Sequence, residues 1–484
     1  MLNLLGNSPP TACNRVTRRT ALQAAGSGLL GLSLANVMAA EQLAPSTSKL
    51  KPRAKSVIFM FLFGGPSQLE TFDCKPDAPA KIRGPFMPIA CRTPDLRISE
   101  HLPRVAGITD QLCVIRTMTH NYNDHSGGGH YIQTGHRWQV PLGGGFNATN
   151  RDWPSMGSVT EYVEQHRAGA KPSELPNYAV LPNFLGKLQE FSSQLRRPGE
   201  YGGWLGRGYD GLTTNITKRS AKDNPYFRAC TDDELKYEIQ GLSLPEGITL
   251  DRLEKRQTLV SQFDDSLRQL DHHAGIAAWD RLQQRAWSLA TSSATRKALN
   301  LTEENPDLRD RYGRNLFGQS TLMARRLVEA GTRFVTVHFD ACDGQSWDSH
   351  SSSNDVKKHL LPSLDNALAS LVEDLKDRGM LDETLVVCMG EMGRTPQANA
   401  TWGRSHWSTL FPAVLAGGGI KRGIVYGSSD KDAAYPIDKP VTPEDLAATI
   451  YTALGIDPHM QLADMQGRPV PIVDGGCPLE ELFG

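Results

Sequence analysis

Five continuous apolar runs predict strands that are buried on both faces. The first, SVIFMFLFGG, is closed by two glycines, and its length and flanks are typical of a central strand in a parallel sheet. The other four are LCVIRTM, RFVTVHFD, TLVVCMGEMGR and AVLAGGG, which places the five runs at residues 56–65, 112–118, 333–340, 384–394 and 413–419.

Helical periodicity fills the spaces between these strands. Residues 317–330 predict a helix that stops at Gly331, and the C-terminal segment TPEDLAATIYTALG predicts one with a threonine cap and a stop at Gly455. Because strands alternate with helices, we expect an α/β fold with a largely parallel sheet and helices on both faces. The strongest pattern lies between residues 356 and 378 and ends at Gly379, with leucines in steps of three and four at Leu361, Leu364, Leu368, Leu371 and Leu375.

The middle of the chain differs from this alternation. From about residue 150 to 312 it is first rich in glycine and proline and then charged and strongly helical. One amphipathic face there carries Leu253, Val260, Phe263, Leu267 and Leu270. We interpret the segment as a helical insertion within a single domain of residues 55–480, because no internal repeat or second core is evident.

The first forty residues have the pattern of an export signal. Arg15, Arg18 and Arg19 precede a mildly apolar run rich in glycine and alanine, and the small residues VMAA offer a cleavage site. Paired arginines before a weakly apolar run indicate the twin-arginine export machinery. The alternative, a signal anchor, fits less well because the run is short and broken by glycine. Residues 1–40 are therefore expected to be removed on export to the periplasm, followed by a linker at 41–54 and a chain with no membrane span.

Composition and cysteine spacing exclude several classes. The chain has 52 Lys plus Arg against 53 Asp plus Glu, a formal net charge of -1, and no basic block follows the signal, so nucleic acid is not an expected partner. Seven cysteines remain after Cys13 leaves with the signal, and none forms a CxxC pair. Their odd number and wide spacing indicate neither a zinc ribbon nor a disulfide framework.

Polar residues of the types that bind metals or anions follow the predicted strands. Sites in open α/β sheets gather beyond the carboxyl ends of the strands, so the shared placement of these residues predicts one site. A further loop before the fifth strand, WGRSHW, adds Arg404 and His406. After the first four strands come, in order, Ser67, Gln68, Glu70 and Asp73; His120, Asp124, His125, Ser126 and His130; Asp340, Asp343, Asp348 and His350; and Glu391 and Arg394.

Each cluster also has a structural alternative. The histidines of HNYNDHSGGGH could brace a glycine-rich loop, although glycines also let backbone N–H groups approach an anion. The pair in WDSH could be solvated, Glu391 could pair with Arg394, and His406 could be packed among aromatic residues of the core. Glu70 and Asp73 are typical acids of a helix start.

Several motifs together resemble one family. FGGPSQLETFD, H-x4-HS-x3-H-x3-TG, WDSH, GEMGRTP, GRSHW and LAGGGI follow one another through essentially the whole chain after the signal. They are similar to the sulfatase-like domain-of-unknown-function family 1501, which is placed in the alkaline phosphatase superfamily. The resemblance implies a mixed, mostly parallel central sheet flanked by helices, with one or two divalent metals at its carboxyl edge. It also implies a nucleophile at a helix start that attacks a phosphate or sulfate ester.

The chain departs from that pattern in ways that bear on chemistry. No C/S-x-P-x-R cassette precedes Thr134, since nine residues before it stands His125, and formylglycine formation is therefore not supported. The first strand ends in Gly64 instead of aspartate, and Met392 stands where the superfamily has a histidine. Within the family, Gln68 and Glu70 occupy positions where histidine and aspartate are expected.

These observations favour an exported metal-dependent hydrolase of phosphate-type esters, ahead of sulfate esters, on a small-molecule or glycan substrate. A zinc, manganese or calcium ion is the expected cofactor. Ser126 is the candidate nucleophile, unless a water activated by the metal attacks directly, and His125 assists. Arg394 or Arg404 is expected to neutralise the oxyanion. The expected metal ligands are Asp348, His350, Glu391, His406 and His130.

Two alternatives belong to other classes. A non-catalytic periplasmic binding protein would keep the fold and an altered pocket for a phosphorylated or sulfated glycan, and Gly64 and Met392 favour it. A structural exported protein without a ligand would use the same histidines for stability alone.

Overall fold

The computed structural model describes residues 50–138, 148–167, 175–182, 197–214, 216, 219–220, 223–237, 292–339 and 347–484. The expected signal, most of the expected linker, the amphipathic face at 253–270, and Asp340 and Asp343 lie outside the described residues. Within the described part of the chain, no helix is both long and apolar enough to cross a bilayer.

The core is an eight-stranded sheet with the order β12-β4-β11-β8-β1-β7-β5-β6. All five apolar runs form strands of this sheet, and neighbouring strands are parallel except where β11 meets β4 and β8. The mixed, mostly parallel sheet expected from the sequence is therefore confirmed. The strands are β1 (Ser56–Phe61), β4 (Leu112–Met118), β5 (Tyr178–Leu181), β6 (Leu212–Thr213), β7 (Phe334–His338), β8 (Thr384–Met389), β11 (Phe411–Ala416) and β12 (Ile424–Tyr426).

The reversed strand has a simple cause in the chain that precedes it. Between β8 and β11 the chain forms only the short pair β9 (Gly393–Arg394) and β10 (His406–Trp407), with no helix to carry it back along the sheet. β11 therefore starts at the edge where β8 ends. As a result, the loop before β11 reaches the same edge as the loops that follow the parallel strands.

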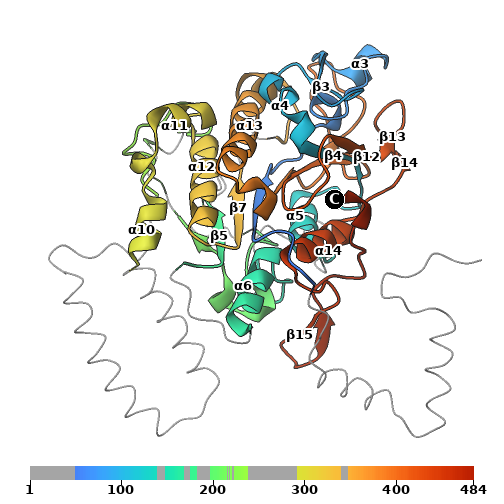
Figure 1. Ribbon diagram of the computed structural model, residues 1–484. Helices are drawn as coiled ribbons and strands as arrows, with labels where there is room; N and C mark the ends of the chain where they lie inside the picture. The colour runs from blue at the N-terminus through green and yellow to red at the C-terminus, as the bar shows by residue number, and fades with distance from the viewer. Residues whose placement is uncertain are drawn as a thin grey trace, which may run out of the picture.

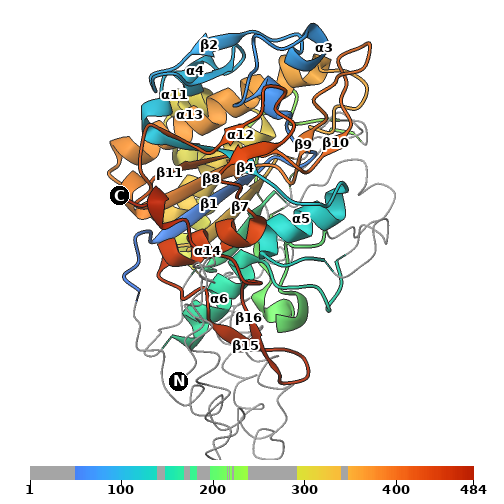
Figure 2. The same ribbon diagram turned by 90° about the vertical axis from the view of Figure 1, so that its right-hand side faces the viewer.

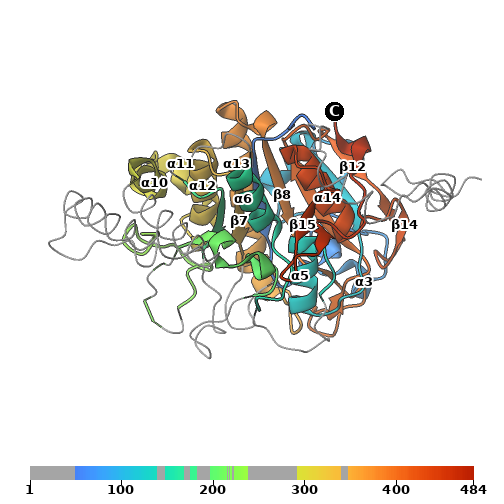
Figure 3. The same cartoon turned by 90° about the horizontal axis from the view of Figure 1, so that it is seen from below.

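Helices cover both faces of the sheet, as Figures 1 and 2 show. Every second residue of a central strand such as β1 points to one face, so Ile58 and Met60 join one core and Val57 and Phe59 the other. Figure 3 looks onto the second of these faces. The first face carries α4 (Pro103–Ala106), α10 (Ser293–Leu299), α11 (Pro306–Tyr312), α12 (Leu316–Glu329) and α13 (Leu361–Asp377), and the second carries α5 (His125–Thr134), α6 (Met156–His166) and α14 (Pro443–Leu454).

The helix ends follow the sequence signals. Arg378 caps α13 and Gly379 follows with a φ of 68°, while one turn of π-helix at Val356–Leu360 precedes that helix. α14 begins with a capping box between Thr442 and Asp445 and ends at the left-handed Gly455. The described parts of the middle segment contribute β5 and β6 to the sheet in addition to α6, α10 and α11.

Short elements decorate this core. Cys477 is disulfide-bonded, whereas Cys74, Cys91, Cys113, Cys230 and Cys388 are free thiols. The hairpin formed by β15 (Gln461–Ala463) and β16 (Pro469–Pro471) projects at the end of the molecule opposite α3 (Ala80–Arg83), as Figure 2 shows. The elements are α3 (Ala80–Arg83), the pairs β2 (Pro88–Ala90) with β3 (Arg97–Ser99), β13 (Ser428–Ser429) with β14 (Pro436–Asp438) and β15 (Gln461–Ala463) with β16 (Pro469–Pro471), and 3-10 turns at Gln68–Glu70, Thr109–Gln111, Gly203–Leu205, Arg207–Tyr209, Leu301–Glu303, Leu381–Glu383 and Glu480–Leu482.

The turn after β1 brings two strand ends into close contact. Gly64 and Gly65 adopt φ values of 111° and 74°, which side chains with a Cβ rarely allow. A Cβ on Gly65 would lie 2.8 Å from the carbonyl oxygen of Met392, in the loop that follows β8. The glycines therefore permit the approach of the β1 and β8 ends on which the candidate site is built.

We expect Gly65→Ala to lower the free energy of unfolding by about 2–4 kcal/mol, because a left-handed conformation and an overpacked contact both oppose the new Cβ. Denaturant unfolding followed by circular dichroism measures this loss. Gly379→Ala is the matched control: its φ is also positive, but a Cβ there meets nothing within 4 Å, so about 1 kcal/mol is expected. Equal losses in the two variants would show that the close approach costs nothing.

Candidate metal centre

Three imidazoles surround the carboxylate of Asp348 at the carboxyl edge of the sheet. His125 Nε2 lies 3.2 Å from Asp348 Oδ2, and His406 Nε2 lies 3.2 Å from Oδ1. His350 Nε2 is 3.0 Å from the same Oδ1 and 3.0 Å from His406 Nε2. Ligand atoms of His125, Asp348 and His406 all lie within 4.8 Å of one another, a spacing that suits a single metal ion.

His125 is held by both the helix that it starts and the strand beside it. It is the first residue of α5, whose N-cap Asp124 accepts a hydrogen bond from the Gly127 amide at 2.7 Å. Its Nδ1 lies 2.5 Å from Glu391 Oε1. Because Glu391 takes Nδ1, the Nε2 atom faces Asp348. A carboxylate on the outer nitrogen of a metal-binding histidine is a common arrangement that fixes the ring and its tautomer.

Glu391 is itself fixed from two sides. It is fully buried, and the Gly64 amide donates to both of its carboxylate oxygens, at 2.9 and 3.1 Å. The ring of His120 contacts the backbone of Glu391. The Tyr122 amide donates to His120 Nδ1 at 3.0 Å, so the proton is on Nε2. This Nε2 donates to the carbonyl oxygen of Glu391 at 2.6 Å. Burial lowers the pKa of His120 to about 4, which keeps this ring neutral.

The other two histidines are held less tightly. His406 Nδ1 donates to the carbonyl oxygen of Asn123 at 2.8 Å, which directs its Nε2 toward Asp348. His406 also belongs to β10, whose pairing with β9 sets its distance from the end of β8. His350 has the most exposed side chain of the group, with 46% of its surface accessible. The open side of the cluster therefore lies at His350.

The electrostatics of the cluster favour positive charge. Burial alone would lower the pKa of His125, but hydrogen bonds to Asp348 and Glu391, together with their charges, raise it to about 9. Burial would raise the pKa of Asp348, yet hydrogen bonds from His125 and His406 and the charge of Arg394 hold it well below its usual range. Without a metal, a protonated imidazole therefore lies between two carboxylates.

Arg394 is buried beneath the cluster instead of facing a substrate. Its side chain is completely inaccessible, and its Nη2 lies 2.5 Å from Asp348 Oδ1. Its other donors are taken by backbone carbonyls: Nε donates to Gly65 at 3.0 Å, Nη1 to Arg404 at 3.3 Å, and Nη2 also to Gly64. The geometry thus gives Arg394 a positioning role and not the expected contact with an oxyanion.

Arg404 is similarly enclosed. Its Nε donates to Glu70 Oε1 at 2.9 Å, and its terminal nitrogens donate to the carbonyls of Ile82, Thr395 and Pro396. Neither arginine proposed from sequence for oxyanion stabilisation is therefore open to a ligand.

Two other sequence candidates have structural contacts. Gln68 accepts a hydrogen bond from the Arg394 amide at 3.0 Å and donates to the carbonyls of Arg394 and Ala433, at 2.8 and 2.9 Å. His130 is fully buried on α5, where its Nδ1 lies 3.2 Å from the carbonyl oxygen of His136 and its Nε2 accepts from the Trp153 amide at 3.3 Å. The structure does not bring His130 together with the cluster, although the sequence suggested it as a ligand.

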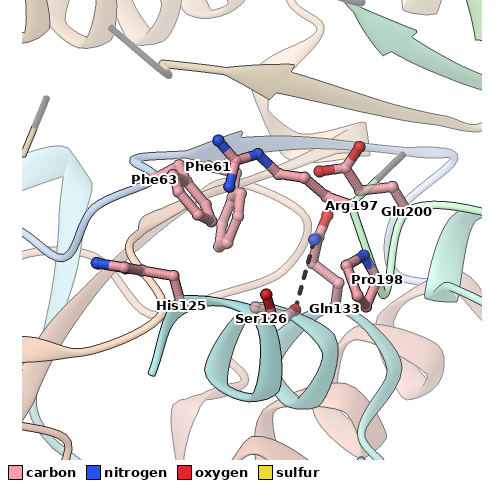
Figure 4. Close-up of a pocket in the computed structure, with 9 residues that line it drawn as sticks. Phe61, Phe63, His125, Ser126, Gln133, Arg197, Pro198 and Glu200 are labelled. Carbon is pink, nitrogen blue, oxygen red and sulfur yellow. Dashed lines mark hydrogen bonds between the residues drawn. The ribbon is translucent and has the colours of Figure 1, made fainter. Parts of the chain in front are cut away.

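Ser126 opens into a pocket next to the cluster (Figure 4). Its side chain is 7% exposed, and no residue in the described ranges forms a hydrogen bond with its hydroxyl. We call this cavity the Arg197 pocket; it is lined by Phe61, Phe63, His125, Ser126, Gly129, Gln133, Arg197, Pro198 and Glu200.

Sequence reasoning missed three residues around these sites. Arg197 and Glu200 come from the middle segment, in RRPGEY, and no strand end marks them as site residues. His120 was noted only as a member of the loop after β4, where nothing in the spacing reveals a contact with Glu391. Only the aromatic and glycine content around residue 200 offered a signal, and that pattern is common in loops.

One protein-family model matches most of the chain. A family model described as "Protein of unknown function (DUF1501)" matches residues 54–483. The chain belongs to this family. The match includes every residue of the cluster and of the Arg197 pocket, so both are built from the family's own segment.

Solved structures that are similar to this chain include a phosphonate monoester hydrolase, a sulfatase and an alkaline phosphatase. The phosphonate monoester hydrolase SpPMH from Silicibacter pomeroyi is 13% identical, with 90% of the DUF1501 chain and 76% of that chain covered and a TM-score of 0.36. The PsFucS1 sulfatase from Pseudoalteromonas sp. is 12% identical over 86% and 70%, with a TM-score of 0.36. Alkaline phosphatase from the Antarctic bacterium TAB5 is 13% identical over 79% and 96%, with a TM-score of 0.29. No curated protein matches the chain in sequence.

We expect Arg394→Ala to destabilise the DUF1501 protein by about 3–5 kcal/mol, since the partly buried Asp348 carboxylate and three backbone carbonyls would lose their buried donor. Thermal and denaturant unfolding measure the loss, and Arg394→Lys should recover only part of it because lysine lacks the planar fork. Arg468→Ala, at an exposed ion pair with Asp464, is the control and should change stability by about 1 kcal/mol or less. If the Arg394→Ala protein is as stable as the wild type, the positioning role is wrong, and a direct contact between Arg394 and a substrate becomes the better explanation.

Proposed function

We propose that this DUF1501 protein is a metal-dependent hydrolase of phosphate-type esters, ahead of sulfate esters. One observation carries the proposal: the ring nitrogens of three histidines converge on one carboxylate, and the outer nitrogen of His125 is already taken by Glu391. Bringing neutral or like-charged imidazole rings this close together costs free energy. A cation bound between them would stabilise the same arrangement. Asp348, His125, His350 and His406 are therefore the proposed ligands, and Glu391 is the residue that orients His125.

The donor set narrows the choice of metal. Three imidazoles and one carboxylate suit zinc or another transition metal better than calcium, which prefers an all-oxygen shell. A divalent ion held there would supply a Lewis acid for the ester oxygen. Because His350 lies on the open side, a substrate would approach between it and the Arg197 pocket.

Ser126 is the proposed nucleophile. It lies in the first turn of α5, beside the ligand His125, and its hydroxyl opens into the Arg197 pocket. The partial positive charge at a helix N-terminus favours the negative charge that develops on an attacking oxygen and on the ester. The absence of a C/S-x-P-x-R cassette in the sequence supports phosphate-type esters over sulfate esters.

Export forms a second part of the proposal. The paired arginines and the apolar run that follows them support transport by the twin-arginine machinery, and so a periplasmic hydrolase of small-molecule or glycan esters.

A binding protein is the second candidate, and the end of β1 favours it. Gly64 has no side chain to offer a metal, and its amide is occupied by the Glu391 carboxylate. Met392 is fully buried against Gly65, so it fills space where the superfamily resemblance implies another ligand. A second metal is therefore not supported here, and ester turnover separates the two candidates.

We expect the signal-free protein to contain close to one equivalent of divalent metal, measured by inductively coupled plasma mass spectrometry. The double variant His350→Ala/His406→Ala should lose it, because two of four ligands are removed. His459→Ala, at an exposed histidine far from the cluster in sequence, is the control and should keep it.

Turnover of p-nitrophenyl phosphate, p-nitrophenyl sulfate and a phosphodiester then tests the reaction. Metal without any turnover would support the binding protein. If the wild type takes up no zinc, manganese or calcium, the hydrolase as proposed is wrong.

The role of Glu391 gives a separate prediction. Glu391→Gln keeps the shape but weakens the charged hydrogen bond to His125, so metal affinity should fall roughly 10–100-fold while the fold is retained. Competition with a chromogenic chelator measures the affinity. Glu383→Gln, at an exposed residue paired with Lys55, should leave it unchanged. A variant that instead loses metal completely would indicate that Glu391 is a ligand, as first expected from the sequence.

A further inference from the structure

His350 is the proposed ligand whose position depends most on its own backbone. Its side chain is 46% exposed, and its polar contacts are those with Asp348 and His406. His406, by contrast, has separate anchors in β10 and in the carbonyl oxygen of Asn123. The backbone of residues 349–352, which we call the His350 segment, therefore decides where the His350 ring lies.

The side chain of Asn399 joins the His350 segment to the turn at residues 399–403, which we call the Asn399 turn. Its Nδ2 donates to the carbonyl oxygen of His350 at 2.9 Å. Its Oδ1 accepts from the amides of Thr401 and Gly403, at 2.9 and 2.8 Å, and these bonds close the turn. One side chain thus uses both ends of its amide group, the oxygen for the turn and the nitrogen for the backbone of a proposed ligand.

The Asn399 turn and the His350 segment also contact each other through their main chains. The amide of Arg404, directly after the turn, donates to the carbonyl oxygen of Ser349 at 3.0 Å. A Cβ on Gly403 would overlap the carbonyl oxygen of His350, so only glycine allows this approach. The two segments are therefore in direct backbone contact, and two residues beyond Arg404 the same chain reaches His406.

Trp402 shows that tertiary contacts determine the shape of the turn. Its φ is 70°, in the left-handed region that bulky residues rarely adopt. Such a conformation persists only where the surrounding structure determines it, and here Trp402 forms an antiparallel bridge with Ser352 of the His350 segment. The Asn399 turn is therefore held against this segment by contacts and not by local preference.

We propose that Asn399 is a positioning residue that fixes the His350 segment against His406. The inference rests on the proposed function for its meaning, because His350 and His406 are proposed metal ligands. Asn399 itself is exposed and acts through the His350 backbone. His406 keeps its own anchors, so a loss of Asn399 acts on the metal through His350.

A double-mutant cycle on zinc affinity tests this role in the signal-free protein. Competition with a chromogenic chelator measures the affinity of the wild type, Asn399→Ala, His350→Ala and the double variant. Asn399→Ala should weaken zinc binding roughly tenfold or more, as is typical for residues that orient metal ligands. In the His350→Ala protein, which keeps three of the four proposed ligands, the same change should have less than about a twofold effect, because the ligand that it positions is gone.

Asn305→Ala is the matched control. Asn305 is also exposed, and its side-chain oxygen accepts from the Asp307 amide at 2.8 Å at the start of α11. The control removes a similar bond in another turn and should keep the zinc affinity of the wild type.

Asn399→Asp separates the turn from the ligand segment. It keeps the oxygen that closes the turn and replaces the donor to His350 with a second oxygen. The same cycle applies to it, because the effect of its added charge is present in both backgrounds and cancels. If Asn399→Ala does not fold, Asn399→Asp decides.

An equal factor in the two backgrounds, or no change in either, overturns the positioning role and keeps the metal centre. If the wild type takes up no metal, the proposed function fails, and hydrogen exchange of the Arg404 amide, followed by nuclear magnetic resonance, decides on Asn399 alone. This amide should exchange faster in Asn399→Asp than in the wild type, because its partner Ser349 is no longer held. Unchanged exchange overturns the proposal.

Discussion

The buried guanidinium of Arg394 holds the carboxyl edge of the sheet together. Burying a charge costs several kcal/mol unless partners surround it, and here the partners are Asp348 and the carbonyls of Gly64, Gly65 and Arg404. These groups come from the loops after β1 and β7 and from the loop before β11. The requirement to satisfy one cation therefore fixes three loops that are far apart in the chain. It also places the Asp348 carboxylate at the bottom of the cluster.

Gly64 connects this cation to the histidines. Its carbonyl accepts from Arg394, while its amide donates to both oxygens of Glu391. Glu391 in turn fixes His125, whose Nε2 meets the Asp348 carboxylate that Arg394 also holds. The contacts thus form a closed ring through backbone and side chains. An aspartate at position 64 could not adopt the same φ of 111° without strain, so this ring and a ligand on the first strand exclude each other.

The sequence predicted the strands and the meeting of their loops, but not the role of each residue. Apolar runs such as 56–65 and 384–394 are buried best as central strands of a sheet. The polar residues that follow these strands then lie together at one edge of the sheet. Residue type does not say whether a carboxylate binds metal or orients a histidine, so the sequence suggested Glu391 as a ligand and could not reveal its contact with His125. His130 is five residues beyond His125, which turns it about 140° around the helix. That spacing, applied to α5, was the available signal that the two histidines point apart.

For the proposed metal-dependent hydrolase, the charges of the cluster would favour an anionic ester over a neutral one. Asp348 and Glu391 carry two negative charges and Arg394 one positive charge, and a proton on His125 balances them when no metal is bound. Metal binding requires His125 to be neutral, so a divalent ion exchanges one positive charge for two. With the proposed ion bound, the site would have an excess of one positive charge, in a partly buried place where such an excess is poorly screened. A phosphate or sulfate group neutralises it, whereas a carboxylic ester or an amide leaves it unbalanced.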